Sequence, residues 1–183
     1  MGIAAIQLVR EAGALAFVTV GSEDKLRLLI DRIGAVGGAN RHDGPWLETL
    51  RAAPSLAGAV DVVLDPVASS YAEQNLEALA VDGRWVLYSL LSGPGLPEAV
   101  GKGFLGALAR KRISLLATTL RARPLAYKAA LVDGFARDVL PKLASGRLEH
   151  IIDRTFPGLA HAQAAHDYME TNANAGKIVL RVK

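Results

Sequence analysis

The sequence predicts an α/β fold in which a parallel sheet carries helices on both faces. Short apolar runs rich in β-branched residues, such as Ala16–Val20 and Val60–Leu64, alternate with segments of helical periodicity. Glycine, proline and Asp-Gly turns separate these runs. The distance between successive runs leaves room for a crossover helix, and connections of that kind join parallel strands.

Each element follows from the same pattern. Strands are expected, in chain order, at Ala16–Val20, Gly38–Asn40, Val60–Leu64, Arg84–Leu91, Ile113–Thr118, Ile151–Phe156 and Lys177–Val182. Helices are expected before Ala16 and at Glu23–Ile33, Trp46–Ala53, Ser70–Ala80, Leu105–Lys111, Pro124–Ser145 and Leu159–Glu170. Gly34 suits a helix C-terminus, and Pro141 should interrupt the long helix. The Gly/Pro-rich segment Ser92–Gly103 predicts a mobile loop.

Composition narrows the function classes. The 183 residues suit one domain, or one domain with a small appendage. The absence of cysteine excludes disulfides, thiolate zinc sites and cysteine nucleophiles, and it fits a cytoplasmic protein. No apolar run is long and charge-free enough to span a bilayer. The basic cluster Arg110–Arg112 lacks interleaved aromatics, so a solvated face or a small phosphate ligand is favoured over nucleic acid.

The candidate site lies where the strands end, because ligands of such sheets bind outside the carboxyl ends of the strands. Gly21 allows a tight turn after the first strand, and Ser22 and Lys25 can bind a phosphate there. Arg41 ends the next strand on the same rim and can bind a phosphate with two parallel hydrogen bonds. The alternatives stay open: Ser22 can be a simple helix cap, and Lys25 and Arg41 can be solvated surface residues.

Other chemistries find less support in the sequence. His161 and His166 are five residues apart on one helix, which points them in different directions and does not suit one metal ion. Ser69 and Ser70 precede a helix without the glycine-flanked elbow of hydrolases. Paired carboxylates at a useful spacing are absent, and no catalytic residue can be named. Hydride transfer fits, because the cofactor carries that chemistry and the protein supplies position.

Five segments resemble the zinc-free quinone oxidoreductases related to ζ-crystallin, which belong to the medium-chain dehydrogenase/reductase superfamily. The resemblance is closest to the p53-inducible branch, and it covers essentially the whole chain. The segments are Gly2–Leu8 (GIAAIQL), Val18–Lys25 (VTVGSEDK), Ala80–Tyr88 (AVDGRWVLY), Thr118–Arg123 (TTLRAR) and Tyr168–Leu180 (YMETNANAGKIVL). The resemblance implies an NADPH-dependent reductase of quinones that acts as a dimer.

The resemblance also assigns roles to residues. Ser22 and Lys25 would hold the 2′-phosphate of NADP(H), and Arg41 stands where the family commonly has a tyrosine against the adenine and phosphate. Ser89 and Leu90 would lie near the nicotinamide, and Asn174 would contact the cofactor from the far side. Gly2 matches the last glycine of the pyrophosphate loop.

The same resemblance predicts an incomplete architecture. Residues 1–148 would form a Rossmann-type doubly wound domain that lacks its first strand, which should leave a gap beside Ala16–Val20. Residues 149–183 would be a strand-helix-strand remnant of a missing catalytic domain, so that this chain by itself would be inactive or nearly so. Ser89 and Ala68-Ser69 replace common family glycines.

Two further functions are compatible with parts of the sequence. A non-catalytic nucleotide-binding or dimerisation module would use the edge strand Ile113–Thr118 to pair two chains across a two-fold axis. A Rossmann methyltransferase fits the strand pattern but leaves the Gly21–Lys25 motif and the C-terminal motif unexplained.

Overall fold

The computed structural model describes residues 1–182, which form two compact units. The central unit comprises Phe17–Leu26 and Val36–Leu125. The terminal unit comprises Met1–Ala16, Arg27–Ala35 and the chain from Ala126 onward. No described helix is long and apolar enough to cross a membrane.

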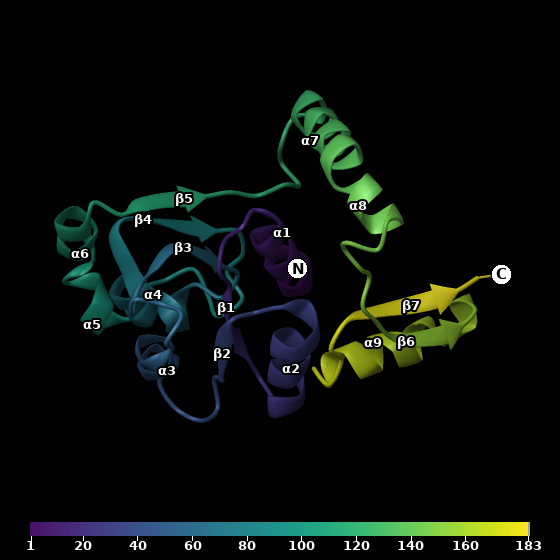
Figure 1. The fold of residues 1–183 in the computed structure, drawn as a ribbon, viewed down its shortest axis with the longest axis horizontal. Helices are drawn as coiled ribbons and strands as arrows, with labels where there is room; N and C mark the ends of the chain where they lie inside the picture. The colour runs from purple at the N-terminus through teal and green to yellow at the C-terminus, as the bar shows by residue number, and fades with distance from the viewer. Residues whose placement is uncertain (183) are drawn as a thin grey trace. The chain divides into compact units, whose positions relative to one another are not determined.

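The central unit contains two parallel sheets (Figure 1). In one, β1 (Phe17–Val20) pairs with β2 (Gly37–Asn40); in the other, β4 (Leu79–Leu87) lies between β3 (Val60–Asp65) and β5 (Ser114–Ala117). Within residues 1–182 no ladder joins β1 to β3, so the gap expected beside the first observed strand is confirmed. The α/β class with parallel strands is confirmed too.

A hydrophobic cluster joins the two sheets across that gap. It is centred on Trp46 and the fully buried Leu50 of α3 (Trp46–Ala52). Phe17 of β1 and Val60 of β3 both pack against it. Shared burial of apolar surface therefore holds the two sheets together in the absence of a backbone ladder.

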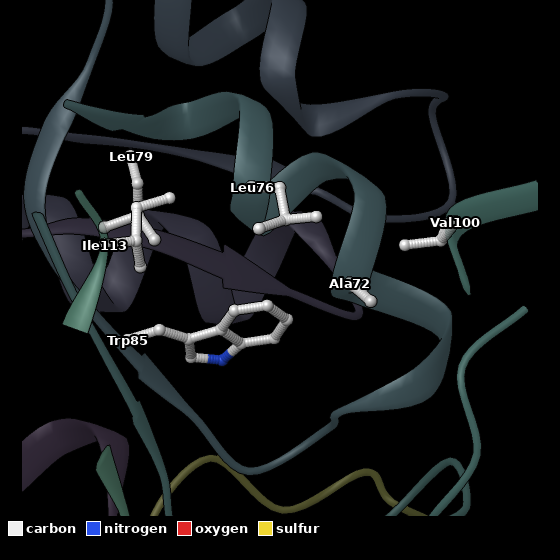
Figure 2. Packing of buried hydrophobic residues seen from close by; sticks show 6 residues of the cluster. All are labelled: Ala72, Leu76, Leu79, Trp85, Val100 and Ile113. Carbon is white, nitrogen blue, oxygen red and sulfur yellow. The ribbon is translucent and has the colours of Figure 1, made fainter. Parts of the chain in front are cut away.

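Helices on the other sheet form a second cluster (Figure 2). Trp85 of β4 is 2% exposed and meets the ring of Phe104 edge-on at 6.1 Å. The helices of this part are η2 (Ser69–Tyr71), α4 (Ala72–Ala78), α5 (Glu98–Gly101) and α6 (Phe104–Lys111). The prediction of a mobile loop over Ser92–Gly103 is wrong in its second half, because α5 forms there and buries Val100 in this cluster.

The strand predicted at Arg84–Leu91 begins and ends earlier, as β4. Asp82 has φ +64° and Arg112 has φ +51°, and the two side chains form a double ion pair with both N–O distances at 2.7 Å. This contact keeps the turn at Asp82 within β4, where it forms an irregularity in the pairing with β3. The turn therefore does not precede the strand, as the sequence had predicted. After Leu87 the backbone N–H of Leu91 bonds to the Pro66 carbonyl oxygen instead of to a strand neighbour.

The basic cluster Arg110–Arg112 is partly engaged within the protein. The Lys111 ammonium donates to three carbonyl oxygens at the end of α4, those of Leu76, Glu77 and Leu79, at 2.7–2.9 Å. Partial burial lowers the pKa of Lys111. Lysine at a helix C-terminus satisfies carbonyls that otherwise lack partners.

The terminal unit contains the remaining elements. They are α1 (Gly2–Glu11), the π-helix η1 (Leu28–Ile33), α7 (Leu125–Asp138), α8 (Leu140–Ala144), β6 (Ile152–Pro157), η3 (Leu159–His161), α9 (Ala162–Glu170) and β7 (Lys177–Arg181). β6 and β7 are parallel neighbours, as a strand-helix-strand unit requires. Gly34 ends η1 in the left-handed region, and Pro141 lies in the first turn of α8 after the break from α7, so both sequence predictions are confirmed.

Candidate functional site

The end of β1 carries three of the predicted site residues. Gly21 and Ser22 follow the strand directly, and α2 (Glu23–Arg27) starts after them. The Ser22 hydroxyl oxygen accepts a hydrogen bond from the Lys25 backbone N–H at 3.4 Å, so Ser22 caps the helix. Capping uses the oxygen as an acceptor, and the hydroxyl proton stays available to a ligand oxygen. The two interpretations of Ser22 are therefore compatible.

Arg41 lies directly against Gly21. Its backbone N–H donates to the Val20 carbonyl oxygen at 2.8 Å, which continues the pairing of β1 and β2 by one residue. A Cβ atom on Gly21 would lie 2.9 Å from both terminal nitrogens of the Arg41 guanidinium. The structure thus brings Gly21, Ser22, Lys25 and Arg41 together at one sheet edge, and the small size of Gly21 permits the arrangement.

A turn after β2 fixes the backbone of Arg41. The Asn40 amide donates to the Asp43 carboxylate at 3.1 Å, and its oxygen accepts from the His42 N–H at 3.3 Å. Acidic Glu23 and Asp24 occupy the first turn of α2, so the rim is not strongly positive overall. An anion there would be held by directed hydrogen bonds from Ser22, Lys25 and Arg41.

An open cavity of about 350 Å³ lies at the carboxyl ends of β4 and β5. Leu87, Tyr88 and the predicted site residues Ser89 and Leu90 line it from the β4 side. Ala117, Thr118, Thr119 and Arg123 line it from the β5 side. Burial, with a smaller effect of the Asp65 carboxylate, raises the pKa of Tyr88, so its phenol stays protonated at neutral pH.

The loop after β3 is held by Asp65, a residue that sequence analysis did not single out. Asp65 is 2% exposed at the end of β3. One carboxylate oxygen accepts from the backbone N–H groups of Val67 and Ala68, at 2.7 and 3.0 Å. The other accepts from the Asn75 amide and the Trp85 indole, both at 2.9 Å. The sequence does contain a signal for this role, because an acidic residue ends the apolar strand VDVVLD. A carboxylate buried at such a position needs several hydrogen-bond donors.

Two loops are joined next to this carboxylate. Ala68 has φ +71° and ψ −115°, a conformation that residues with a Cβ rarely adopt. The Ser92 hydroxyl donates to the Val67 carbonyl oxygen at 2.7 Å and accepts from the Ser70 N–H at 2.9 Å. These bonds fasten the loop after β3 to the loop after β4, which carries Ser89 and Leu90.

Gly2 and Asn174 belong to the terminal unit. Gly2 is the exposed first residue of α1. Asn174 is half-buried, and its amide donates to the Gly176 carbonyl oxygen at 3.1 Å in the turn before β7. Their roles as cofactor contacts stay predictions.

The described residues contain no group of three or more His, Cys, Asp or Glu side chains that could hold a metal ion. His161 and His166 are both exposed. Because the sequence also lacks cysteine, the residues present do not fit a zinc site.

Comparison with known proteins identifies the family. The zinc-binding dehydrogenase family model matches residues 43–180. Mouse (Mus musculus) prostaglandin reductase-3 is 30% identical over 97% of this chain and 48% of its own length. The highly reducing polyketide synthase ALT1 of Alternaria alternata is 28% identical over the whole chain and 7% of its own length. The quinone oxidoreductase of Thermus thermophilus, solved also in complex with NADPH, is 28% identical with a TM-score of 0.77, covering 99% of this chain and 54% of that one.

The chain therefore spans about half the length of the reductase and a small part of the synthase. Zinc appears in the description of the matching family, although the described residues of this chain do not fit that ion. The match covers most of the chain, and the parallel α/β fold agrees with it. The chain belongs to the zinc-binding dehydrogenase family, within the medium-chain dehydrogenase/reductase superfamily of oxidoreductases.

Proposed function

We propose that this chain is the NADPH-binding part of a reductase that transfers hydride to a quinone. The observation that carries the proposal is the arrangement of Arg41 on Gly21 beside Ser22 and Lys25. The quinone is supported by the resemblance and by the 28% identity to the Thermus thermophilus quinone oxidoreductase.

The residues at the end of β1 fit the phosphate-bearing cofactor. Enzymes that use NAD commonly place an acidic residue at the end of the second strand of the Rossmann fold, where it binds the ribose hydroxyl groups. By the resemblance, β1 corresponds to that second strand. Here Gly21 and Ser22 follow the strand, and a guanidinium lies over the glycine. A guanidinium, an ammonium and a hydroxyl are suitable donors for the three oxygens of a 2′-phosphate. Gly2, the first residue of α1, is expected to contact the pyrophosphate on the resemblance alone.

The cavity at the ends of β4 and β5 would receive the nicotinamide and the acceptor. NADPH, when bound, supplies the hydride. Ser89 and Leu90 would then position the ring, and the side chains of Leu87 and Ala117 would keep water away from the reacting carbon. Asn174 is expected to contact the cofactor on the resemblance alone.

Nicotinamide fluorescence tests this assignment. We expect NADPH emission to rise and shift to shorter wavelength when the chain is added, because the ring enters an apolar cavity. Replacing Leu90 by Asp should remove most of the change, whereas the exposed substitution Leu105→Asp on α6 should not. An emission spectrum unaffected by the chain would contradict the proposal.

Oxidation of NADPH tests the acceptor. We expect menadione to oxidise NADPH in the presence of the chain, even if slowly, and we expect an aldehyde not to do so. The reverse preference would exclude the quinone as the acceptor.

A second candidate function, a non-catalytic nucleotide-binding or dimerisation module, is favoured by the exposure of β5. All four residues of this edge strand are exposed, including Leu115 at 41% and Leu116 at 49%. An exposed apolar edge strand is suited to pair with a second copy of itself across a two-fold axis. We expect a homodimer by light scattering, and Leu116→Lys should shift it to monomer. A monomer at every concentration would rule this pairing out.

A further inference from the structure

The loop after β3 contains a peptide unit that is held at both ends, the one between Val67 and Ala68. Its N–H group donates to the buried carboxylate of Asp65 at 3.0 Å. Its carbonyl oxygen accepts two hydrogen bonds from Ser92, one from the hydroxyl at 2.7 Å and one from the backbone N–H at 2.9 Å. One side chain of β3 and one residue of the loop after β4 therefore set the orientation of this peptide unit.

This orientation requires a strained backbone at Ala68. Its φ of +71° with ψ of −115° is a combination that glycine adopts freely and that residues with a Cβ atom avoid. A rotation of the peptide unit before Ala68 would return φ to negative values. The same rotation would turn the N–H group away from Asp65 and the carbonyl oxygen away from Ser92. The hydrogen bonds at the two ends thus hold Ala68 against its own conformational preference.

The loop after β4 depends on the same segment of the chain. The backbone N–H of Leu91 donates to the Pro66 carbonyl oxygen at 3.0 Å, one residue before the contacts of Ser92. Ser89 and Leu90 directly precede these contacts, and both line the cavity at the ends of β4 and β5. A rotated peptide unit in the loop after β3 would therefore release the loop after β4 immediately beyond Ser89 and Leu90.

We propose that Ser92 is a positioning residue of the nicotinamide site. Its hydroxyl keeps the peptide unit before Ala68 in the strained orientation, and this orientation holds Ser89 and Leu90 at the cavity. The inference rests on the proposed function, which places the nicotinamide beside these two residues. Ser92 itself is assigned no contact with the cofactor, so its effect is confined to the nicotinamide end.

Amide hydrogen exchange of the full chain without cofactor tests the hold on the peptide unit. Ser92 is exposed, so Ser92→Ala should leave the fold intact while it removes the hydroxyl contacts with Val67 and Ser70. The amides of Ala68 and Leu91 donate to other groups. We expect both to exchange roughly threefold to tenfold faster in Ser92→Ala, the effect of one neutral hydrogen bond. Ser92→Thr keeps a hydroxyl and should restore slow exchange. Unchanged exchange at both amides in Ser92→Ala would overturn the proposal.

A double variant tests whether strain at Ala68 links the two loops. Ala68→Gly removes the cost of the positive φ, so the peptide unit should keep its orientation without the hydroxyl. We expect the double variant Ala68→Gly, Ser92→Ala to exchange more slowly at Leu91 than Ser92→Ala alone. Equally fast exchange in the two proteins would overturn the proposal, because a mere loss of one surface hydrogen bond would not be rescued by glycine.

Two ligands separate the nicotinamide end from the phosphate end. NADPH reports on the nicotinamide through its emission, and 2′,5′-ADP carries the phosphate-bearing end without the nicotinamide. Ser92→Ala should lose most of the emission change and bind 2′,5′-ADP within about twofold of the unaltered chain. Ser55→Ala, at an exposed position in the loop before β3, is the matched control and should alter neither. A full emission change in Ser92→Ala, or a comparable loss of 2′,5′-ADP binding, would overturn the proposal.

Failure of the proposed function would be recognised separately. If the unaltered chain bound neither ligand and left the NADPH emission unchanged, the proposed function would be contradicted. The hydrogen exchange would still decide whether Ser92 holds the two loops, because it is measured without a ligand.

Discussion

The guanidinium of Arg41 lies where a side chain of residue 21 would be. A Cβ atom on Gly21 would meet both terminal nitrogens at 2.9 Å and the central carbon at 3.0 Å. Gly21 and Arg41 end two neighbouring strands, so the parallel pairing of β1 and β2 determines this contact. The glycine matters here through the space it leaves, since its φ is not in the left-handed region.

Gly21→Ala should displace the Arg41 guanidinium and leave the fold intact. We expect NADPH affinity to fall roughly tenfold, the equivalent of one charge-assisted hydrogen bond, and NADH affinity to change little. Fluorescence titration with both cofactors measures the two effects. Gly95→Ala is the matched control, because nothing lies within 4 Å of its added Cβ atom. An equal loss of affinity for NADH and NADPH would mean that the contact between Gly21 and Arg41 does not contribute to binding of the 2′-phosphate.

Asp65→Asn should destabilise the central unit by about 3 kcal/mol. The two oxygens of Asp65 accept four hydrogen bonds from N–H groups, and an asparagine would point an NH₂ group at two of these donors. Denaturant unfolding measures the loss. Asp61→Asn, at an exposed position of the same strand, should change stability by less than about 0.5 kcal/mol. Similar losses of unfolding free energy in Asp65→Asn and Asp61→Asn would show that the four hydrogen bonds of Asp65 do not contribute specifically to stability.

Ala68→Gly should raise stability by about 1 kcal/mol, because glycine adopts φ +71° and ψ −115° without a Cβ clash. An alanine-to-glycine change normally has the opposite sign. Ala109→Gly, at an exposed position in α6, should lower stability by about 1 kcal/mol. Thermal unfolding of both variants checks the signs, and a destabilised Ala68→Gly protein would show that the backbone there is not strained.

Glu11 should make the stability of the terminal unit depend on pH. Its side chain is 11% exposed and contacts Lys142 at 3.2 Å and Arg147 at 2.8 Å. The hydrogen bond from Lys142, together with both positive charges, holds the pKa of Glu11 below its ordinary 4.5. Its stabilisation is therefore present above that value and is lost as pH falls through the lowered pKa.

Glu11→Gln removes this contribution at every pH. We expect the melting temperature of Glu11→Gln to lie below that of the unaltered chain at neutral pH, and the difference to shrink as pH falls through the lowered pKa of Glu11. Glu170→Gln, at an exposed position on α9, should show no such convergence. If the difference in melting temperature between Glu11→Gln and the unaltered chain stayed constant as the pH was lowered, the ion pairs of Glu11 would not be its cause.

Much of the fold could be predicted from the sequence, because its signals are local. Apolar runs such as Val60–Leu64 gave strands within one or two residues, and Gly34 and Pro141 ended or interrupted helices as expected. The extent of β4 could not be predicted, since the turn at Asp82 is retained in the strand by Arg112, thirty residues away. Periodicity carries no information on such a pair.

The candidate site, like the fold, could be predicted from the sequence only in part. The position of Gly21, Ser22, Lys25 and Arg41 at one sheet edge could be predicted, because strand ends of a parallel sheet meet at one edge. Their binding of a phosphate stays a prediction. The contact between Gly21 and Arg41 was not, because it depends on a side-chain conformation. The role of Asp65 was missed, since it depends on hydrogen-bond donors that the ladder of β3 and β4 brings together.

Calorimetric titration of the chain with NADPH and with NADH tests the central claim most directly. The account predicts binding of NADPH at least tenfold tighter than that of NADH, and loss of this difference in the double variant Lys25→Ala, Arg41→Ala. Equal affinity for the two cofactors, or an undiminished preference for NADPH in the double variant, would contradict the phosphate site at the ends of β1 and β2.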